Sequence, residues 1–254
     1  MDFNVLPGPP LAELARTTMA SVSAAVVTCP GPAVLPPATV PVRTGQRGDP
    51  VLLPSPGSML ARHLAAGPAM VTVTVPADAP FSALRLTGMT RPRVPRPGVT
   101  QPGRTRQGMT RPGITASAMT WPGAPRDAYP VVLNAVEFTG TAPAQVALAQ
   151  YEAAAPDPFR REAPMTLRHL ERRHMTELVG CVRAHGITTA EWVIPRHLDR
   201  FGLELLVLTS SGLAAVRLAF PGGPVTETAD VPLSIRALLA CRCASESRQS
   251  ERRP

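Results

Sequence analysis

The chain is organised around the stretch from Asp157 to Gly186, DPFRREAPMTLRHLERRHMTELVGCVRAHG. Asp157 followed by Pro158 predicts the start of a helix, because an Asp N-cap with proline at the first helical position is a common opening. Gly186 predicts its end. Side chains recur at spacings of three and four between these points, so they share one face of the helix. This stripe consists of Leu167, Leu170, His174, Leu178, Cys181 and His185.

The histidines of this stretch raise the question of a metal site. His169 and His174 are five residues apart, so on an ideal helix at ~100° per residue they point about 140° apart. We therefore expect no shared ion, in contrast to the i, i+4 pair of an H-E-x-x-H motif. His174 and His185 lie about three helical turns apart, which is too far for one ion. We expect no metal site, and we interpret His174 as part of a packed stripe.

The composition bounds the class of protein. A chain of 254 residues can form one large domain or two small ones, each with a real core. No run of about 18 apolar residues occurs, so no membrane span is expected. The four cysteines occur without a secretory signal at the N-terminus, which favours a cytoplasmic protein with free thiols.

The formal net charge of +8 is concentrated in two segments, residues 88–127 and 242–254. Both lack the interleaved aromatic side chains on which nucleic-acid bases stack. We therefore do not expect nucleic-acid binding. Residues 88–127 consist of four proline- and arginine-rich decapeptides that each begin with Gly or Ala. Their few apolar side chains predict a disordered insertion in a loop, with a flexible arm for acidic partners as the alternative.

The N-terminal half alternates short strands with two small helices. Helices are predicted at 10–19 and 59–66, and strands at 21–28, 39–43, 51–53, 70–75, 81–87 and 131–139. The clearest strand is MVTVTV at 70–75, where apolar and polar residues alternate. Residues 146–154 predict either a short strand or a helix. Many short strands with few helices favour a β-barrel over a βαβ sheet.

The C-terminal half predicts a helix, three strands and a further helix. The strands are expected at 191–195, 203–209 and 213–220, and Asp230 is expected to cap a helix that ends near Ala240. The fold class is therefore α+β, a β-barrel followed by a small α-β-β-β-α domain. The predicted divisions are a disordered N-terminus at 1–9, a barrel domain at 10–156, the α+β domain at 157–243 and a disordered tail at 244–254.

The segment GDPVLLPSPGSMLARHLAAGPAMVTVTV, residues 48–75, resembles the first half of flavin-binding split barrels of the haem-utilisation type, which are pyridoxamine-phosphate-oxidase-like. The family helix carries Ser-x-Leu-Ala-x-His-x-x-Asn-Leu. Ala66 stands where the family has Asn, whereas Arg85 and Gly88 match the strand that follows. The helix positions that match are Ser58, Leu60, Ala61 and His63.

Residues 154–178, AAPDPFRREAPMTLRHLERRHMTEL, are similar to the passage into this family's C-terminal domain of unknown function. That passage ends in His-x-Asn-x-Asp-His. His169 and His174 keep its spacing, while Glu171 replaces the Asn and Arg173 the Asp. The pattern of the small domain is matched further on by Gly202, Leu203, Leu205, Arg217 and Phe220.

The resemblance implies a six-stranded split barrel that forms a homodimer, with FMN or haem at the dimer interface. Known members include haem-degrading oxygenases and flavin oxidoreductases, and chloroplast relatives regulate tetrapyrrole synthesis by binding an enzyme. The residues expected to hold the flavin or tetrapyrrole are Arg43, Ser58, His63 and Arg85. No histidine follows His197, so the C-terminal haem ligand of some members has no counterpart.

Two functions stay open at this point. The first is a haem- or FMN-binding protein that acts as a haem-degrading or flavin-dependent oxidoreductase. The second is a non-catalytic binding or regulatory module that retains the split-barrel scaffold. No catalytic residue is assigned by the sequence.

Overall fold

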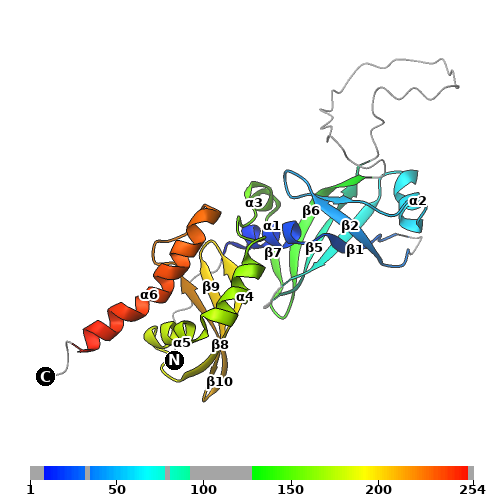
Figure 1. The fold of residues 1–254 in the computed structure, drawn as a ribbon. Helices are drawn as coiled ribbons and strands as arrows, with labels where there is room; N and C mark the ends of the chain where they lie inside the picture. The colour runs from blue at the N-terminus through cyan, green and yellow to red at the C-terminus, as the bar shows by residue number, and fades with distance from the viewer. Residues whose placement is uncertain (1–8, 32–34, 78–80, 92–127, 251–254) are drawn as a thin grey trace, which may run out of the picture. The chain divides into compact units, whose positions relative to one another are not determined.

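The computed structural model describes residues 9–31, 35–77, 81–91 and 128–250 (Figure 1), with the side chains of residues 241–250 left out. Most of the repeat segment at 88–127 therefore lies outside the described residues. Contacts divide the chain into two compact units, Val22–Glu152 and a second made of Met1–Ser21 with Ala153–Pro254. We call them the barrel unit and the C-terminal unit. The prediction placed residues 10–21 with the barrel, whereas their contacts lie in the C-terminal unit.

In the described part of the barrel unit, six antiparallel strands close into a barrel. The strand order is β3-β2-β1-β4-β5-β6, and β3 also pairs with β6. A short additional strand, β7 (Ala144–Val146), continues the sheet beyond β6. This arrangement confirms the predicted barrel. The strands are β1 (Ala24–Thr28), β2 (Ala38–Thr44), β3 (Pro50–Leu52), β4 (Met70–Pro76), β5 (Phe81–Thr90) and β6 (Tyr129–Gly140).

The core of the barrel follows from period-two alternation along the strands. Val71, Val73 and Val75 of β4 point inward and are fully buried, while the threonines between them face outward. Leu84 and Leu86 of β5 do the same. These β-branched and aliphatic side chains form the barrel interior, as the alternating pattern predicted.

Two small helices flank the barrel. Helix α2 (Met59–Ala66) is held by the Tyr129 hydroxyl on β6, which lies 3.5 Å from the Ala61 carbonyl oxygen. Helix α3 (Leu148–Ala153) carries the buried Tyr151, whose hydroxyl donates to the Gly48 carbonyl at 2.8 Å. These bonds anchor both helices to strands and turns distant in sequence.

The C-terminal unit contains a three-stranded antiparallel sheet of order β10-β9-β8. Helices α4 and α5 pack against β8, and α6 packs against α5. The buried core between them includes Leu170, Leu178, Val193, Leu205 and Leu238. The elements of this unit are α1 (Leu11–Ser21), α4 (Ala163–Arg173), α5 (Met175–Ala184), β8 (Ala190–Asp199), β9 (Gly202–Thr209), β10 (Gly212–Ala219), the 3-10 helix η1 (Thr228–Asp230) and α6 (Val231–Ser250).

The single helix expected from Asp157 to Gly186 is wrong in two respects. Its first residues form a turn, and α4 begins only at Ala163. The helix is also interrupted at His174, whose backbone angles are φ −128° and ψ 22°. Asp157 caps no helix, because its carboxylate binds the backbone N–H groups of Phe159 and Arg200.

The predicted end at Gly186 is confirmed. Gly186 has a φ of 100°, in the left-handed region that favours glycine. Its N–H donates to the Arg183 carbonyl, and the N–H of Ile187 donates to the Val182 carbonyl. This pair of bonds is a Schellman cap, and it satisfies carbonyls that the end of α5 would otherwise leave without donors.

The last helix is longer than predicted. Helix α6 continues to Ser250 rather than ending near Ala240, so residues 244–250 of the expected disordered tail are helical. Residues 244–250 are Ala, Ser, Glu, Ser, Arg, Gln and Ser, so four of the seven have good helix propensity and neither Gly nor Pro interrupts the segment. Residues 251–254 lie outside the described part of the chain.

Candidate functional site

The four residues expected to bind a cofactor lie on β2, α2 and β5 of the barrel unit. Among the described contacts, no hydrogen bond or ion pair joins any two of Arg43, Ser58, His63 and Arg85. Arg43 is exposed on β2, opposite Val51 of β3. The single chain therefore does not assemble these side chains into one cluster of donors.

Ser58 has a structural role. It is the N-cap of α2, and its hydroxyl oxygen accepts a hydrogen bond from the Ala61 N–H at 3.1 Å. This bond satisfies one of the N–H groups that the first turn of a helix leaves without a carbonyl partner. One acceptor position of the Ser58 oxygen is thus already occupied.

Arg85 is also engaged. Its Nη1 atom lies 3.0 Å from Glu137 Oε1 on the neighbouring strand β6. Gln145 of β7 donates to the other oxygen of Glu137 at 3.0 Å. Because a carboxylate already neutralises this guanidinium, Arg85 is a poor candidate for a phosphate anion in this conformation.

An open groove of about 290 Å³ lies beside α2 in the barrel unit. Its described lining is mainly aliphatic and proline side chains, with three hydroxyl groups and no charged side chain. Of the four predicted residues, only Ser58 lines it. The lining residues are Leu35, Pro36, Pro37, Ala38, Thr39, Val40, Pro54, Ser55, Ser58, Met59 and Leu60.

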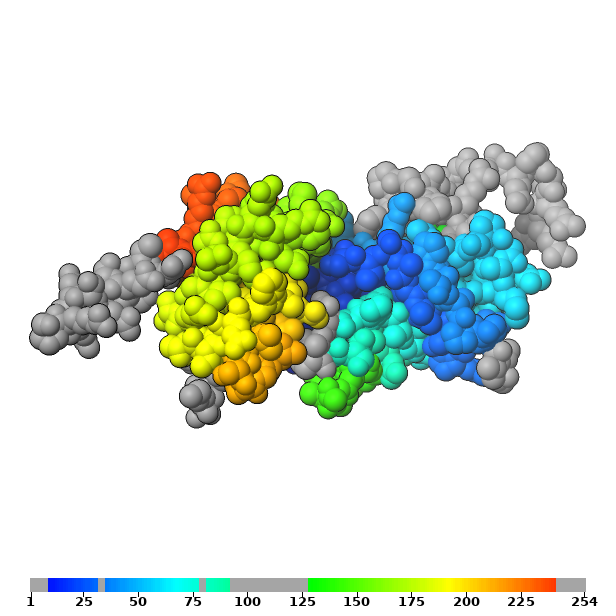
Figure 2. Space-filling model, turned by 60° about the horizontal axis from the view of Figure 1, so that its bottom comes forward, coloured from blue at the N-terminus to red at the C-terminus, as the bar shows by residue number. Residues whose placement is uncertain are grey.

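Met59 is the residue of this groove that sequence reasoning missed. Its side chain is 54% exposed at the start of α2. His63 lies four residues later and is half-buried, so the two side chains share one face of the helix. The α2 segment lies at the surface of the barrel unit (cyan in Figure 2). A thioether thus lines the apolar groove, and an imidazole lies about one helical turn further along α2; both groups are able to bind iron.

The groove chemistry discriminates between the two expected cofactors. The phosphate of FMN is a dianion and requires charge-assisted donors. The described lining supplies hydroxyl groups alone, so it does not fit that phosphate. A tetrapyrrole needs apolar walls and an iron ligand, and the lining together with Met59 and His63 provides both kinds of group.

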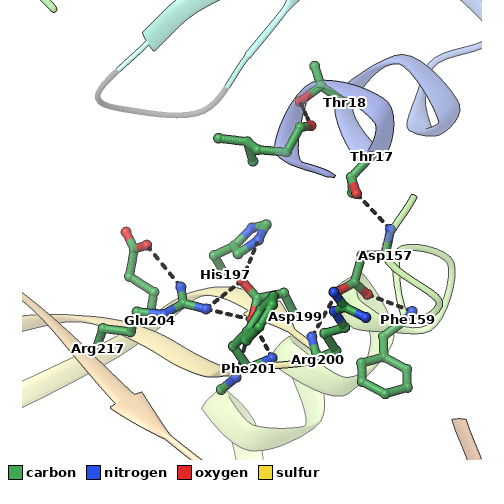
Figure 3. Close-up of polar contacts among 12 residues, drawn as sticks. Thr17, Thr18, Asp157, Phe159, His197, Asp199, Arg200, Phe201, Glu204 and Arg217 are labelled. Atoms are coloured by element: carbon green, nitrogen blue, oxygen red, sulfur yellow. Dashed lines mark hydrogen bonds and ion pairs between the residues drawn. The ribbon is translucent and has the colours of Figure 1, made fainter. Parts of the chain in front are cut away.

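A second polar cluster lies within the C-terminal unit, around two buried carboxylates (Figure 3). Asp199 closes the turn between β8 and β9. Its oxygens accept from Arg217 Nη2 at 2.5 Å, from the Phe201 N–H at 2.8 Å and from the Gly202 N–H at 3.2 Å. His197 Nε2 lies 3.6 Å from the same carboxylate.

Asp157 joins the N-terminal helix to the β8–β9 turn. Its carboxylate accepts from the N–H groups of Phe159 and Arg200, both at 2.7 Å, and its own N–H donates to Thr17 Oγ1 on α1 at 2.7 Å. The Arg200 side chain pairs with Glu13 of α1 at 2.6 Å. These contacts explain why α1 belongs to this unit.

Burial raises the pKa of Asp157 above its ordinary value, although the N–H groups of Arg200 and Phe159 act in the opposite direction. Burial likewise raises the pKa of Glu13, against the lowering effect of Arg200. Asp157 and Asp199 are each 2% exposed and are bound by groups of the protein itself. We therefore interpret this cluster as a scaffold for the unit and not as an acid–base dyad.

Two features are absent from the described residues. No group of three or more His, Cys, Asp or Glu side chains is placed to hold a metal ion. No described helix is both long enough and apolar enough to cross a membrane.

Comparisons with known proteins bear on the fold. The sequence matches no protein-family model and no curated protein. A solved structure of a heme binding protein from Mycobacterium smegmatis is similar at a TM-score of 0.60 and 20% identity, over 95% of this chain and 100% of that one. A protein of unknown function from Agrobacterium tumefaciens covers 94% of this chain at 15% identity, with a TM-score of only 0.34. The chain therefore shares the fold of the mycobacterial protein.

Proposed function

We propose that this chain is a haem-binding split-barrel protein that holds one edge of the macrocycle in the groove beside α2. The observation that carries the proposal is an apolar groove that Met59 lines, without a charged lining side chain, with His63 one helical turn further along α2. The shared fold with a heme binding protein of Mycobacterium smegmatis supports the same ligand class.

The size of the groove sets how the ligand would bind. About 290 Å³ is just below the roughly 300–1,000 Å³ typical of ligand pockets. The groove thus takes part of a tetrapyrrole, and the remaining face of the ring stays outside it. In the homodimer that the family resemblance implies, a second copy of the chain would cover that face.

The iron ligand is proposed to be His63 or Met59. Both side chains lie on one face of α2, so they approach a bound ring from the same side and only one of them would bind the iron of that ring. A neutral imidazole and a thioether are both established haem ligands, and they produce different absorption spectra. Substitution of each in turn identifies which one binds.

FMN is the less well supported cofactor. Its phosphate would need Arg85 to leave Glu137, and it would compete with the Ala61 N–H for the Ser58 hydroxyl. Arg43 is exposed and carries a charge that could meet an acidic ligand group. A haem propionate is as suitable a partner for it as a phosphate.

The proposed activity is binding, without a catalytic step. The buried carboxylates of the C-terminal unit are bound by groups of the protein itself, and no catalytic constellation is evident among the described residues. This favours the non-catalytic binding or regulatory module over an oxygenase. An oxygenase would show decay of the haem spectrum when a reductant and oxygen are added.

The test is a hemin titration of the full chain followed by absorbance in the Soret region. We expect a saturable Soret shift, and at least a ~10-fold weaker affinity for either Met59→Leu or His63→Ala. Matched controls are Met165→Leu and His185→Ala, which alter an exposed methionine and an exposed histidine of the C-terminal unit. No Soret shift, or equal affinities for all four variants, would refute the proposal.

A further inference from the structure

The break between α4 and α5 brings two histidines together that an unbroken helix would keep apart. His174 leaves helical geometry, and its Nε2 atom lies 3.3 Å from Nε2 of His169. The ring centres are 5.1 Å apart and the ring planes are tilted by 58°. The imidazoles therefore converge at their nitrogen atoms and are not stacked on each other. The expected divergence of these side chains is wrong, because it assumed one continuous helix.

The separation of the two nitrogen atoms matches a pair of ligands on one tetrahedral ion. Two metal–nitrogen bonds of about 2.05 Å at a tetrahedral angle place the nitrogens about 3.35 Å apart. The observed distance is 3.3 Å. Axial ligands on opposite sides of a haem iron would be about 4 Å apart, so the pair does not suit a haem. The geometry suits two adjacent positions on a small ion.

Glu177 is placed to orient one of these rings. Its Oε1 atom lies 3.6 Å from Nδ1 of His174, the ring nitrogen that faces away from His169. Histidines that bind metals usually present their second nitrogen to a carboxylate or carbonyl, which fixes the ring and its tautomer. A proton on Nδ1 leaves Nε2 with a free lone pair for a metal.

The surroundings leave room for further ligands. The side chains of His174 and Glu177 are 33% and 46% exposed, and His169 is exposed. Water can therefore complete a four-coordinate shell, as it does at zinc sites with open positions. Imidazole nitrogen is a preferred donor for zinc, copper, nickel and iron.

We propose that His169 and His174 form a two-histidine site for a divalent first-row transition metal, with Glu177 as the positioning residue. The site lies in the C-terminal unit and uses no residue of the groove beside α2. The metal-site proposal can therefore be tested separately from haem binding. The competing explanation is a plain hydrogen bond between two neutral imidazoles.

The test uses Zn²⁺ as the probe and isothermal titration calorimetry on the full chain at about pH 7.5, where imidazole is mostly neutral. We expect the wild-type chain to bind one more Zn²⁺ than His169→Ala. The difference in stoichiometry isolates this site from other Zn²⁺ sites, such as cysteine thiolates. His185→Ala is the matched control, because Nδ1 of His185 is occupied by the Cys181 carbonyl at 2.9 Å.

Glu177→Gln keeps both imidazoles and should weaken Zn²⁺ binding by roughly 10-fold or more, as losses of such carboxylates do. His174→Ala should abolish the same site. His169 is exposed and lies outside the core. If His174→Ala unfolds, His169→Ala alone tests whether the site binds Zn²⁺. Identical Zn²⁺ isotherms for the wild type and His169→Ala would overturn the proposal and leave the hydrogen bond as the explanation.

Discussion

Replacement of Arg217 by methionine tests whether the buried ion pair holds the C-terminal unit together. The side chains of Arg217 and Asp199 are 9% and 3% exposed, so Arg217→Met would leave a buried carboxylate without its cation. Breaking such a pair costs about 3–5 kcal/mol. Asp199 would keep the N–H groups of Phe201 and Gly202, so we expect the lower end, about 3 kcal/mol.

The matched control is Arg85→Met in the barrel unit. Arg85 and Glu137 form an ion pair at 3.0 Å, but their side chains are 47% and 29% exposed. Exposed pairs contribute about 0–1 kcal/mol, so this substitution should have little effect.

The assay is urea unfolding followed by far-UV circular dichroism and by tryptophan fluorescence, to which Trp192 of the C-terminal unit contributes. With a slope of roughly 1–3 kcal/mol per molar urea, the midpoint of the C-terminal unit should fall by roughly 1–3 M in Arg217→Met. A fall no larger than that of Arg85→Met would refute the reasoning, since the buried pair would then contribute no more than the exposed one.

Three further outcomes follow from the structure. A Cβ atom on Gly88 would lie 2.1 Å from the Val132 carbonyl oxygen, so Gly88→Ala should destabilise the barrel by about 3 kcal/mol in urea unfolding. A Cβ atom on Gly31 would meet no atom within 4 Å, so Gly31→Ala should leave the stability of the barrel unchanged. Gly186→Ala should cost about 1 kcal/mol in the same assay, because alanine is strained at a φ of 100°. The pKa of Asp157 is raised above its ordinary value of 3.8. At pH values between the ordinary pKa and the raised one, the native state therefore binds more protons than the unfolded state. The contribution of Asp157 to stability consequently falls as the pH rises through this range. The stability advantage of the wild type over Asp157→Asn should thus be larger near pH ~4.5 than near pH ~7, and a constant difference would show that Asp157 is not perturbed.

The fold was accessible from the sequence because its signals are local. The alternation of apolar and polar residues in MVTVTV predicts β4. Ser58 marks the start of α2 and Gly67 its end, and Gly186 marks the end of α5. Each signal acts over a few residues and needs no knowledge of distant partners. The number and order of strands then indicated a barrel.

The features that were missed depend on partners far along the chain. The Asp-Pro pair at 157 resembles a helix cap, but the Arg200 N–H, 43 residues away, takes the carboxylate. The break at His174 has no Gly or Pro to mark it, so periodicity alone extends the helix through it. The missed break at His174 alone produced the wrong geometry for the His169–His174 pair.

The candidate groove was missed as well. Its walls come from two segments, residues 35–40 and 54–60, which the antiparallel pairing of β2 with β3 brings together. The proline pairs at Pro36-Pro37 and around Pro54 were the available signal, because prolines keep a segment out of regular strand pairing. Family resemblance directed attention to Ser58 and His63 but not to Met59 between them.

The most direct measurement is a parallel titration of the apo protein with hemin and with FMN, each followed by absorbance and by retention after gel filtration. The proposed function predicts a Soret shift that saturates at a fixed ratio of haem to chain, and no retention of flavin, because the described groove lacks a cation for its phosphate. Retention of FMN without a Soret response to hemin would contradict haem binding at the groove beside α2.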